Sequence, residues 1–157
     1  MSNSEDADRS GGLDAPQKPD EQQRLASLRG LGILDTPPEQ IFDDLAETAS
    51  LIAGTPLAFI SFIDSDRQWF KSKKGFDLIE TPRDTSLCGH TIFKTDGPFV
   101  IRDTKADPNF SASPLVAGYP HVTFYAGAPI LTAAGYAVGT VAVADHKPRE
   151  FSEDQEF

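Results

Sequence analysis

The chain holds 157 residues, 39% of them hydrophobic and 24% charged, a composition typical of one globular domain with a real core. Fourteen Lys and Arg residues against 24 Asp and Glu residues give a net charge of −10, which repels nucleic acid and anionic membranes, so we expect neither as a partner. One cysteine excludes an internal disulfide, and no apolar run approaches the roughly 20 residues of a membrane span, so we expect a reduced, cytoplasmic protein.

Two helices are predicted in the first third of the chain. Residues 1–20 are rich in Ser, Asp, Gly and Pro and lack an apolar period, which predicts a disordered acidic tail. The leucines of residues 21–31 lie three apart and predict a first helix. Thr36, Pro37 and Glu39 have the spacing of a capping box, which predicts a second helix over residues 37–53. Its buried face should carry Phe42, Leu45, Ala49 and Ile52.

Two strands should follow this helix. Residues 57–63 are a continuous apolar run of strand length, and residues 68–73 return after a turn of Asp and Ser. Trp69 and Phe70 are adjacent, so they should point to opposite faces of the sheet. The lysines of this second strand predict that it lies at a sheet edge, where charge discourages pairing with another chain: Lys71, Lys73 and Lys74.

The segment 81–120 is less regular. A short helix is predicted from Thr85 or Ser86 to Phe93, and a short strand over residues 99–101. Residues 105–120 predict a loop with two helical turns, near Pro108 and at Pro114. Loops of this length inside a compact domain are usually functional or mobile.

Residues 121–145 predict a hairpin, with strands over 122–131 and 136–144 and a turn at Gly135. Both strands are mostly apolar and should be covered on both faces. Their small residues leave volume above the sheet: Ala126, Ala128, Gly139 and Ala142. Ser152 can cap a last helix that stops after one turn at Phe157, which predicts that a longer parent protein continues it.

Helices at both ends of an antiparallel sheet predict an α+β sandwich. Three stretches, DTPPE, DRQWFKS and FYAGAP, occur in an order and context that resemble the GAF domain, in particular that of bacterial sensor histidine kinases and cyclic-dinucleotide synthases. The resemblance covers residues 24–157. It implies terminal helices on one face of the sheet, a pocket of short helices and loops on the other, and homodimers formed through the terminal helices. The domain is therefore assigned to residues 21–157, truncated in its C-terminal helix.

The resemblance does not name a ligand. The NKFDE-type signature of cyclic-nucleotide-binding members is absent from the sequence. Bilin-binding members place Cys directly beside His, whereas Gly89 separates Cys88 from His90 here. Free methionine sulfoxide reductases of this fold work through several cysteines, and this chain has one.

Eight residues are candidates for a ligand site, and each also has a plain structural interpretation. Cys88 is either a reactive thiol or a small core residue. His90 and Asp103 are either polar groups at the rim of a pocket or a capping and a turn residue. The others are pocket wall or ordinary core: Phe110, Leu115, Phe124, Tyr125 and Ala128.

No catalytic constellation and no metal-ligand spacing is found in the sequence, and charged pairs such as Arg83-Asp84 are interpreted as solvated. The leading hypothesis is a sensory module without catalysis of its own. It binds a small molecule or responds through the packing of its pocket, and it passes the signal to an effector outside this chain. The alternatives are a redox sensor or enzyme based on Cys88, and a ligand-free dimerising spacer.

Overall fold

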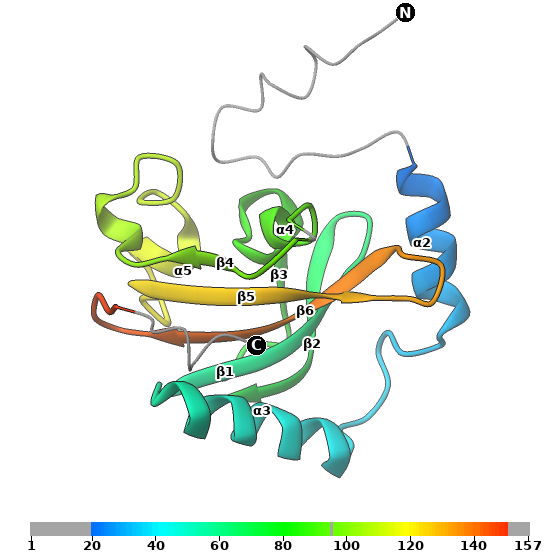
Figure 1. The fold of residues 1–157 in the computed structure, drawn as a ribbon, viewed down its shortest axis with the longest axis horizontal. Helices are drawn as coiled ribbons and strands as arrows, with labels where there is room; N and C mark the ends of the chain where they lie inside the picture. Colours follow the sequence, from blue (N-terminus) through cyan, green and yellow to red (C-terminus); the bar gives the residue numbers. More distant parts are fainter. Residues whose placement is uncertain (1–19, 95, 151–157) are drawn as a thin grey trace, which may run out of the picture.

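The fold is known from a computed structural model, which describes residues 20–94 and 96–150. Six antiparallel strands form one sheet in the order β3-β2-β1-β6-β5-β4 (Figure 1). The strands are β1 (Leu57–Ile63), β2 (Arg67–Lys74), β3 (Glu80–Pro82), β4 (Phe99–Ile101), β5 (Phe124–Leu131) and β6 (Ala137–Asp145). The predicted antiparallel sheet is therefore confirmed.

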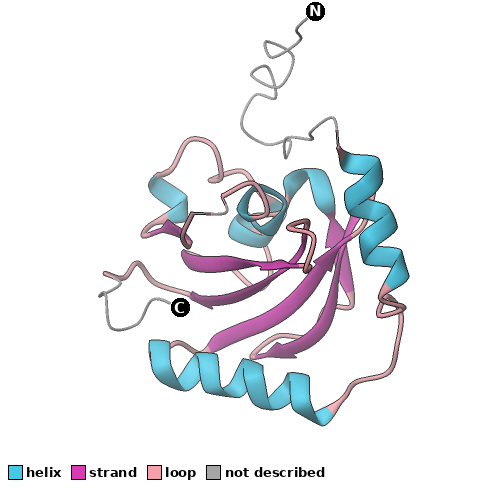
Figure 2. Ribbon diagram, turned by 45° about the vertical axis from the view of Figure 1, so that its right-hand side comes forward, coloured by secondary structure: helices cyan, strands magenta, loops and turns pink. Residues whose placement is uncertain are grey.

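Helices cover both faces of this sheet (Figure 2). The long helices α2 (Glu21–Gly30) and α3 (Gln40–Ala53) pack on one face, whereas α4 (Cys88–Thr91) and α5 (Pro114–Ala117) lie on the other. Two 3₁₀ turns, η1 (Arg83–Thr85) and η2 (Thr104–Ala106), belong to the second side. This confirms the α+β sandwich for the described residues. The predicted final helix and almost all of the predicted tail lie outside them.

The pleat of the sheet divides the core into two sides. On the first side, alanines of α3 pack against β1, β5 and β6, and Leu28 of α2 packs against Trp69 and Val138. On the second side lies a single large cluster that contains Phe59, Phe70 and Cys88 of α4. Trp69 and Phe70 therefore point to opposite faces, as predicted.

The central hairpin was predicted almost to the residue. Strands β5 and β6 pair from Phe124 opposite Asp145 to Leu131 opposite Ala137. Gly135 in the turn has a φ of 93°, a conformation that a side chain would oppose. Strands β1 and β4 have the predicted bounds, and helix α5 begins at the predicted Pro114.

The prediction that β2 is an edge strand was wrong for its first half. The three-residue strand β3, which the sequence did not indicate, pairs with β2 from Arg67 to Trp69 and takes the edge position there. Residues 72–74 of β2 pair with β1 and have no strand partner on the other side within the described residues. The Lys71 side chain is nevertheless not an edge charge, because it is fully buried, and Lys74 pairs with Glu47 of α3.

The predicted capping box was also wrong, and Lys71 is the reason. Helix α3 begins at Gln40, three residues later than predicted, and no side chain caps its first turn. The Lys71 Nζ atom donates to Thr36 Oγ1, the Pro37 carbonyl oxygen and Glu39 Oε2, each at 2.7 Å. A buried ammonium needs such acceptors, so the residues predicted to cap the helix instead surround a cation.

The buried face of α3 also differs from the predicted one, and polar contacts with β2 are again involved. Leu45 and Ile52 are more than half exposed, and the face against the sheet is narrow: Ala46, Ala49, Ser50 and Ala53. Asp43 is exposed, and its carboxylate accepts a hydrogen bond of 2.6 Å from Ser72 Oγ of β2. Polar contacts with β2 therefore set the rotation of α3, and small side chains let it approach the sheet closely.

We predict that Lys71→Met lowers the free energy of unfolding by about 1.5–3 kcal/mol, because three charge-assisted hydrogen bonds are lost from a buried site. Urea denaturation measures this loss. The matched control is Lys74→Met, which removes the exposed Lys74–Glu47 pair and should cost less than about 1 kcal/mol. Equal losses in the two variants would show that the buried ammonium has no special role.

Candidate functional site

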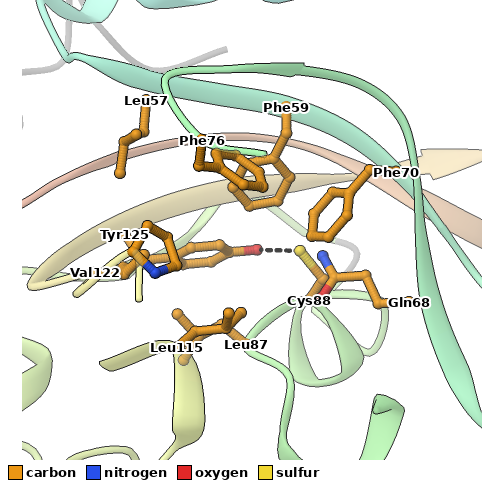
Figure 3. Close-up of a pocket in the computed structure, with 11 residues that line it drawn as sticks. Leu57, Phe59, Gln68, Phe70, Phe76, Leu87, Cys88, Leu115, Val122 and Tyr125 are labelled. Carbon is orange, nitrogen blue, oxygen red and sulfur yellow. Dashed lines mark hydrogen bonds between the residues drawn. The ribbon is translucent and has the colours of Figure 1, made fainter. Parts of the chain in front are cut away.

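A small cavity lies between the sheet and the segments that cover its second face (Figure 3). Its volume is about 10 Å³, close to the minimum that one water molecule needs. The sheet supplies its floor and the covering segments supply its roof. The lining residues are Leu57, Phe59, Gln68, Phe70, Phe76, Leu87, Cys88, Leu115, Pro120, Val122 and Tyr125.

Aromatic rings form one wall of the cavity. The rings of Phe59, Phe70 and Phe76 pack edge to face, with centroids 5.1–5.6 Å apart. Tyr125 lies beside Phe59 at 6.5 Å and continues the series toward Phe99 at 6.2 Å. Such pairs gain energy beyond burial because the edge of one ring meets the electron-rich face of another, so this wall is held in a defined shape.

The Tyr125 ring fills space that the small residues of the hairpin leave. A Cβ atom at Gly127 would collide with the Tyr125 hydroxyl and ring, so the tyrosine can lie along the strand only because residue 127 is glycine. Its hydroxyl is 2.7 Å from Thr91 Oγ1 and 3.1 Å from Cys88 Sγ, both on α4. Tyr125 therefore fastens α4 to the sheet.

Further polar side chains extend this contact across the floor of the sheet. Thr140 Oγ1 donates to Cys88 Sγ at 3.0 Å and lies 2.9 Å from Ser61 Oγ. Gln68 Nε2 donates to Ser61 Oγ at 3.0 Å, and Gln68 Oε1 accepts from Thr81 at 3.1 Å. The network thus runs from the edge strand β3 to α4, and it satisfies polar groups that would otherwise be buried unpaired.

Burial keeps the titratable groups of this network neutral. Burial raises the pKa of the Cys88 thiol, and the hydrogen bonds from Thr140 and Tyr125 offset this only in part. Burial also raises the pKa of Tyr125 well above its ordinary value. A neutral, fully covered thiol is a poor nucleophile and metal ligand.

The eight predicted site residues do not all line the cavity. Cys88, Leu115 and Tyr125 line the cavity. His90 and Phe110 are not among the lining residues but pack ring to ring at 5.0 Å, and Phe110 belongs to the core cluster of the same side. Burial lowers the pKa of His90, with a weaker opposing effect of the Ser86 carbonyl oxygen 3.3 Å away.

The remaining three predicted residues do not line the cavity either. Asp103 caps η2 by accepting a hydrogen bond from the Lys105 backbone amide, which is the turn role considered for it. Phe124 points to the opposite face, where it packs with the alanines of α3. Ala128 lies two residues beyond Ala126, which shares that cluster, and the alternation of a strand puts both on the α3 side.

The prediction that these small residues of the hairpin together leave volume above one face of the sheet was wrong in part, because they do not share a face. Ala142 faces the cavity side, whereas Ala126 lies beneath α3. At Gly139 a Cβ atom would collide with the Ser61 carbonyl oxygen, so this glycine permits a close approach of β1 and β6. Small residues within one hairpin thus serve three different contacts, and only a small void remains.

Sequence reasoning missed the aromatic wall and Gln68. The alternation of side chains along β2 places Gln68 and Phe70 on one face, so the sequence could have indicated that these two residues lie together. Two features could not be predicted from the sequence: a register shift between Ile60 and Ser61 of β1, and the return of the 75–79 loop that brings Phe76 over the sheet. Both depend on how the strands and loop pack in three dimensions.

Two loops meet above the cavity. Phe76 belongs to the β2–β3 loop, residues 75–79, and Leu115 and Pro120 belong to the α5 segment, residues 114–122. The Asp77 backbone amide donates to the Tyr119 hydroxyl at 2.9 Å and joins the two loops. Both residues are exposed, so water can replace this hydrogen bond when the loops separate.

A buried charged cluster connects the roof of the cavity with α2. Arg83 of η1 is only 2% exposed, which corrects its interpretation as a solvated residue. Its guanidinium donates to both carboxylate oxygens of Glu21, the first residue of α2. Glu21 also accepts two hydrogen bonds of 3.0 Å from Arg24, whose side chain reaches the carbonyl oxygens of Ile63 and Ala137.

Glu21 therefore lies between two buried guanidinium groups. Burial of its carboxyl opposes ionisation, but the hydrogen bonds and charges of Arg24 and Arg83 outweigh this effect and hold the pKa of Glu21 below its ordinary value. On the other side of Arg83, its carbonyl oxygen accepts from Ser86 Oγ at 2.8 Å, and Ser86 Oγ accepts from the Gly89 amide of α4. Only short polar contacts separate α2 from α4.

The sequence matches the GAF domain over residues 37–157. This chain belongs to the GAF domain family. A relative among known proteins is a cyclic di-GMP phosphodiesterase of Pseudomonas aeruginosa, 39% identical over 134 residues. The match covers 85% of this chain but only 23% of that protein, so the GAF domain spans less than a quarter of its relative.

Solved structures share the fold at low sequence identity. A GAF domain of an Acinetobacter phosphoenolpyruvate-protein phosphotransferase has a TM-score of 0.59 and 13% identity, with 88% of this chain and 85% of that chain covered. Free methionine-R-sulfoxide reductase of Neisseria meningitidis has a TM-score of 0.58 and 18% identity, with 85% and 77% covered. The family predicted from the sequence is thus confirmed, and with it a domain class that generally serves sensing and regulation in signalling.

Two further properties concern the described part of the chain. Within residues 20–94 and 96–150, no group of three or more His, Cys, Asp or Glu side chains is placed to hold a metal ion. None of the helices there is long and apolar enough to cross a membrane.

We predict that Cys88 reacts with an aromatic disulfide reagent at pH 8 at least about 100-fold more slowly in the native protein than in concentrated urea. The reason is that the thiol is buried and neutral and becomes reactive only when α4 detaches. Release of the coloured thiolate measures both rates. A native rate close to the rate in urea would favour a redox role for Cys88.

Proposed function

We propose that this GAF domain is a sensory module that converts the state of its cavity into a change at α2. The observation that carries the proposal is the Glu21–Arg83 contact. It joins the first residue of α2 to Arg83 of η1, and η1 is followed directly by Ser86 and then by Leu87 and Cys88, which line the cavity. An effector outside this chain reads the change.

A short series of direct contacts connects the cavity with α2. Leu87 and Cys88 line the cavity, and Ser86 ties α4 to the Arg83 carbonyl oxygen. The buried Arg83 side chain then meets the partly buried Glu21 carboxylate, where little water competes for the ion pair. A displacement of α4 therefore either moves α2 or breaks a buried ion pair, and both outcomes alter the N-terminal helix.

The nature of the effector is part of the proposal. The Pseudomonas aeruginosa relative is named a cyclic di-GMP phosphodiesterase, and this chain matches less than a quarter of it. We propose that the domain regulates an effector of cyclic-dinucleotide signalling in the cytoplasm, as a homodimer formed through the terminal helices. Exposed apolar side chains of α3 support such a contact: Ile41, Leu45 and Leu51.

The alternatives have less support. A redox role for Cys88 conflicts with its complete burial and raised pKa. A ligand-free spacer needs neither the polar network beneath the cavity nor a charged connection from η1 to α2, because apolar residues would pack there at least as stably. No catalytic role is proposed for the domain.

We predict that Leu115→Ala raises amide hydrogen exchange in α4 and also in α2, although Leu115 does not lie against α2. An increase of at least about threefold in α2 is expected, because loosening the cavity wall weakens the local structure tied to it. Hydrogen exchange followed by mass spectrometry measures this. Leu131→Ala, at an exposed strand end, is the matched control and should leave α2 unchanged.

A second variant tests whether the response of α2 passes through Glu21 or reflects a general loosening of the domain. Glu21→Gln keeps a hydrogen-bond acceptor but removes the charge shared by Arg24 and Arg83, so the response of α2 to Leu115→Ala should disappear in the double variant. Glu47→Gln, which weakens an exposed pair with Lys74, should preserve that response. If Leu115→Ala affects only residues 75–93 and 114–122, the sensory proposal is wrong and the spacer explanation is favoured.

A further inference from the structure

We infer that the ligand of this cavity is a small, uncharged, apolar molecule that contains an aromatic ring, admitted by separation of the 75–79 and 114–122 loops. This inference rests on the proposed sensory function and names the chemistry of its ligand. Three observations carry it: the charge of the lining, the pairing of its polar groups, and the shape and closure of the cavity.

The lining carries no formal charge. Among its 11 side chains, Gln68, Cys88 and Tyr125 are the polar ones, and the rest are aliphatic or aromatic. A ligand with a carboxylate, phosphate, nitrate or ammonium group would have to leave water without an opposite charge to meet it. Arg83 does not provide such a charge, because it is engaged by Glu21 away from the lining.

The polar lining groups are already paired with each other or with neighbours. Gln68 is bonded at both ends of its amide, to Ser61 and Thr81. The Tyr125 hydroxyl lies between Thr91 and Cys88, and Cys88 also accepts from Thr140. A polar ligand would have to break this network to gain a hydrogen bond, whereas an apolar ligand leaves it intact.

The aromatic wall explains why the ligand should contain an aromatic ring. Phe59 and Phe70, which belong to the sheet and not to the moving loops, are already arranged edge to face, and a further ring can join such an arrangement with the same geometry. An aliphatic molecule gains only burial there, so an aromatic ring is preferred.

The size of the cavity then requires that the loops separate. A volume of about 10 Å³ is far too small for a ring. Phe76, Leu115 and Pro120 form the part of the lining that comes from loops and not from the sheet, and the exposed Asp77–Tyr119 hydrogen bond connects the two loops above them. The bound form therefore lacks this hydrogen bond, and its rupture is part of the cost of binding.

Three probes of the same ring size test the inference: toluene, benzoate and benzylammonium. Each is titrated into the purified chain and followed by backbone amide NMR. Toluene should shift the amides of Leu115, Leu87 and Tyr125 and bind at least about tenfold more tightly than either ion. Equal or tighter binding of benzoate or benzylammonium at these amides would overturn the assignment of an uncharged ligand.

Substitutions test the entry route. Tyr119→Phe removes the hydrogen bond between the loops and should tighten toluene binding by about two- to tenfold, because more molecules are open before binding. Tyr136→Phe, in the turn of the hairpin, is the matched control and should have no effect. Leu115→Ala should also tighten binding, since it enlarges the cavity. Unchanged affinity in Tyr119→Phe would overturn the proposed entrance.

The outcomes separate this inference from the proposed function. If an ion binds best, or if no probe shifts the cavity amides in the wild-type chain or in Leu115→Ala, the ligand class is wrong. The exchange response of α2 to Leu115→Ala is measured without any ligand, so it stands or fails independently. A site that binds toluene while α2 never responds would retain the ligand class and reject the sensory function.

Discussion

The hydroxyl group of Tyr125 holds the second face of this GAF domain together. It meets Thr91 and Cys88 of α4 from strand β5, and its ring lies where Gly127 has no side chain. Helix α4 has four residues, too few to be stable alone. Its place on the sheet, and with it the cavity wall, depends on this buried contact and on the network that Thr140 extends.

Buried cations have a comparable role on the side of the long helices. Lys71 determines where α3 begins, and Arg24 and Arg83 fix the start of α2 through the Glu21 carboxylate. Each cation costs free energy to remove from water and is retained only with several acceptors in place. The positions of α2 and α3 are therefore specified by polar geometry as well as by apolar packing, and α2 is specified partly by a residue of the cavity side.

The two faces of the sheet are connected through Arg83. The cavity lies on one face of the sheet, and the long helices α2 and α3 lie on the opposite face. Arg83, in the turn after β3, reaches around the end of the sheet to Glu21 of α2. The residues that line the cavity and the residues of this connection share only the short segment from η1 to α4, and the proposed sensory function depends on that segment.

The sequence by itself determined the family, the antiparallel sheet, the central hairpin and most element bounds, because these follow from local periodicity, turn residues and short motifs. It also indicated Cys88, Leu115 and Tyr125 as cavity residues. Only the tertiary structure decided which small residue serves which contact, where Lys71 and Arg83 find their partners, and which face of α3 is buried. Those outcomes depend on acceptors 32 and 62 residues away in the chain, and no local pattern specifies contacts that form only when distant strands and helices pack together.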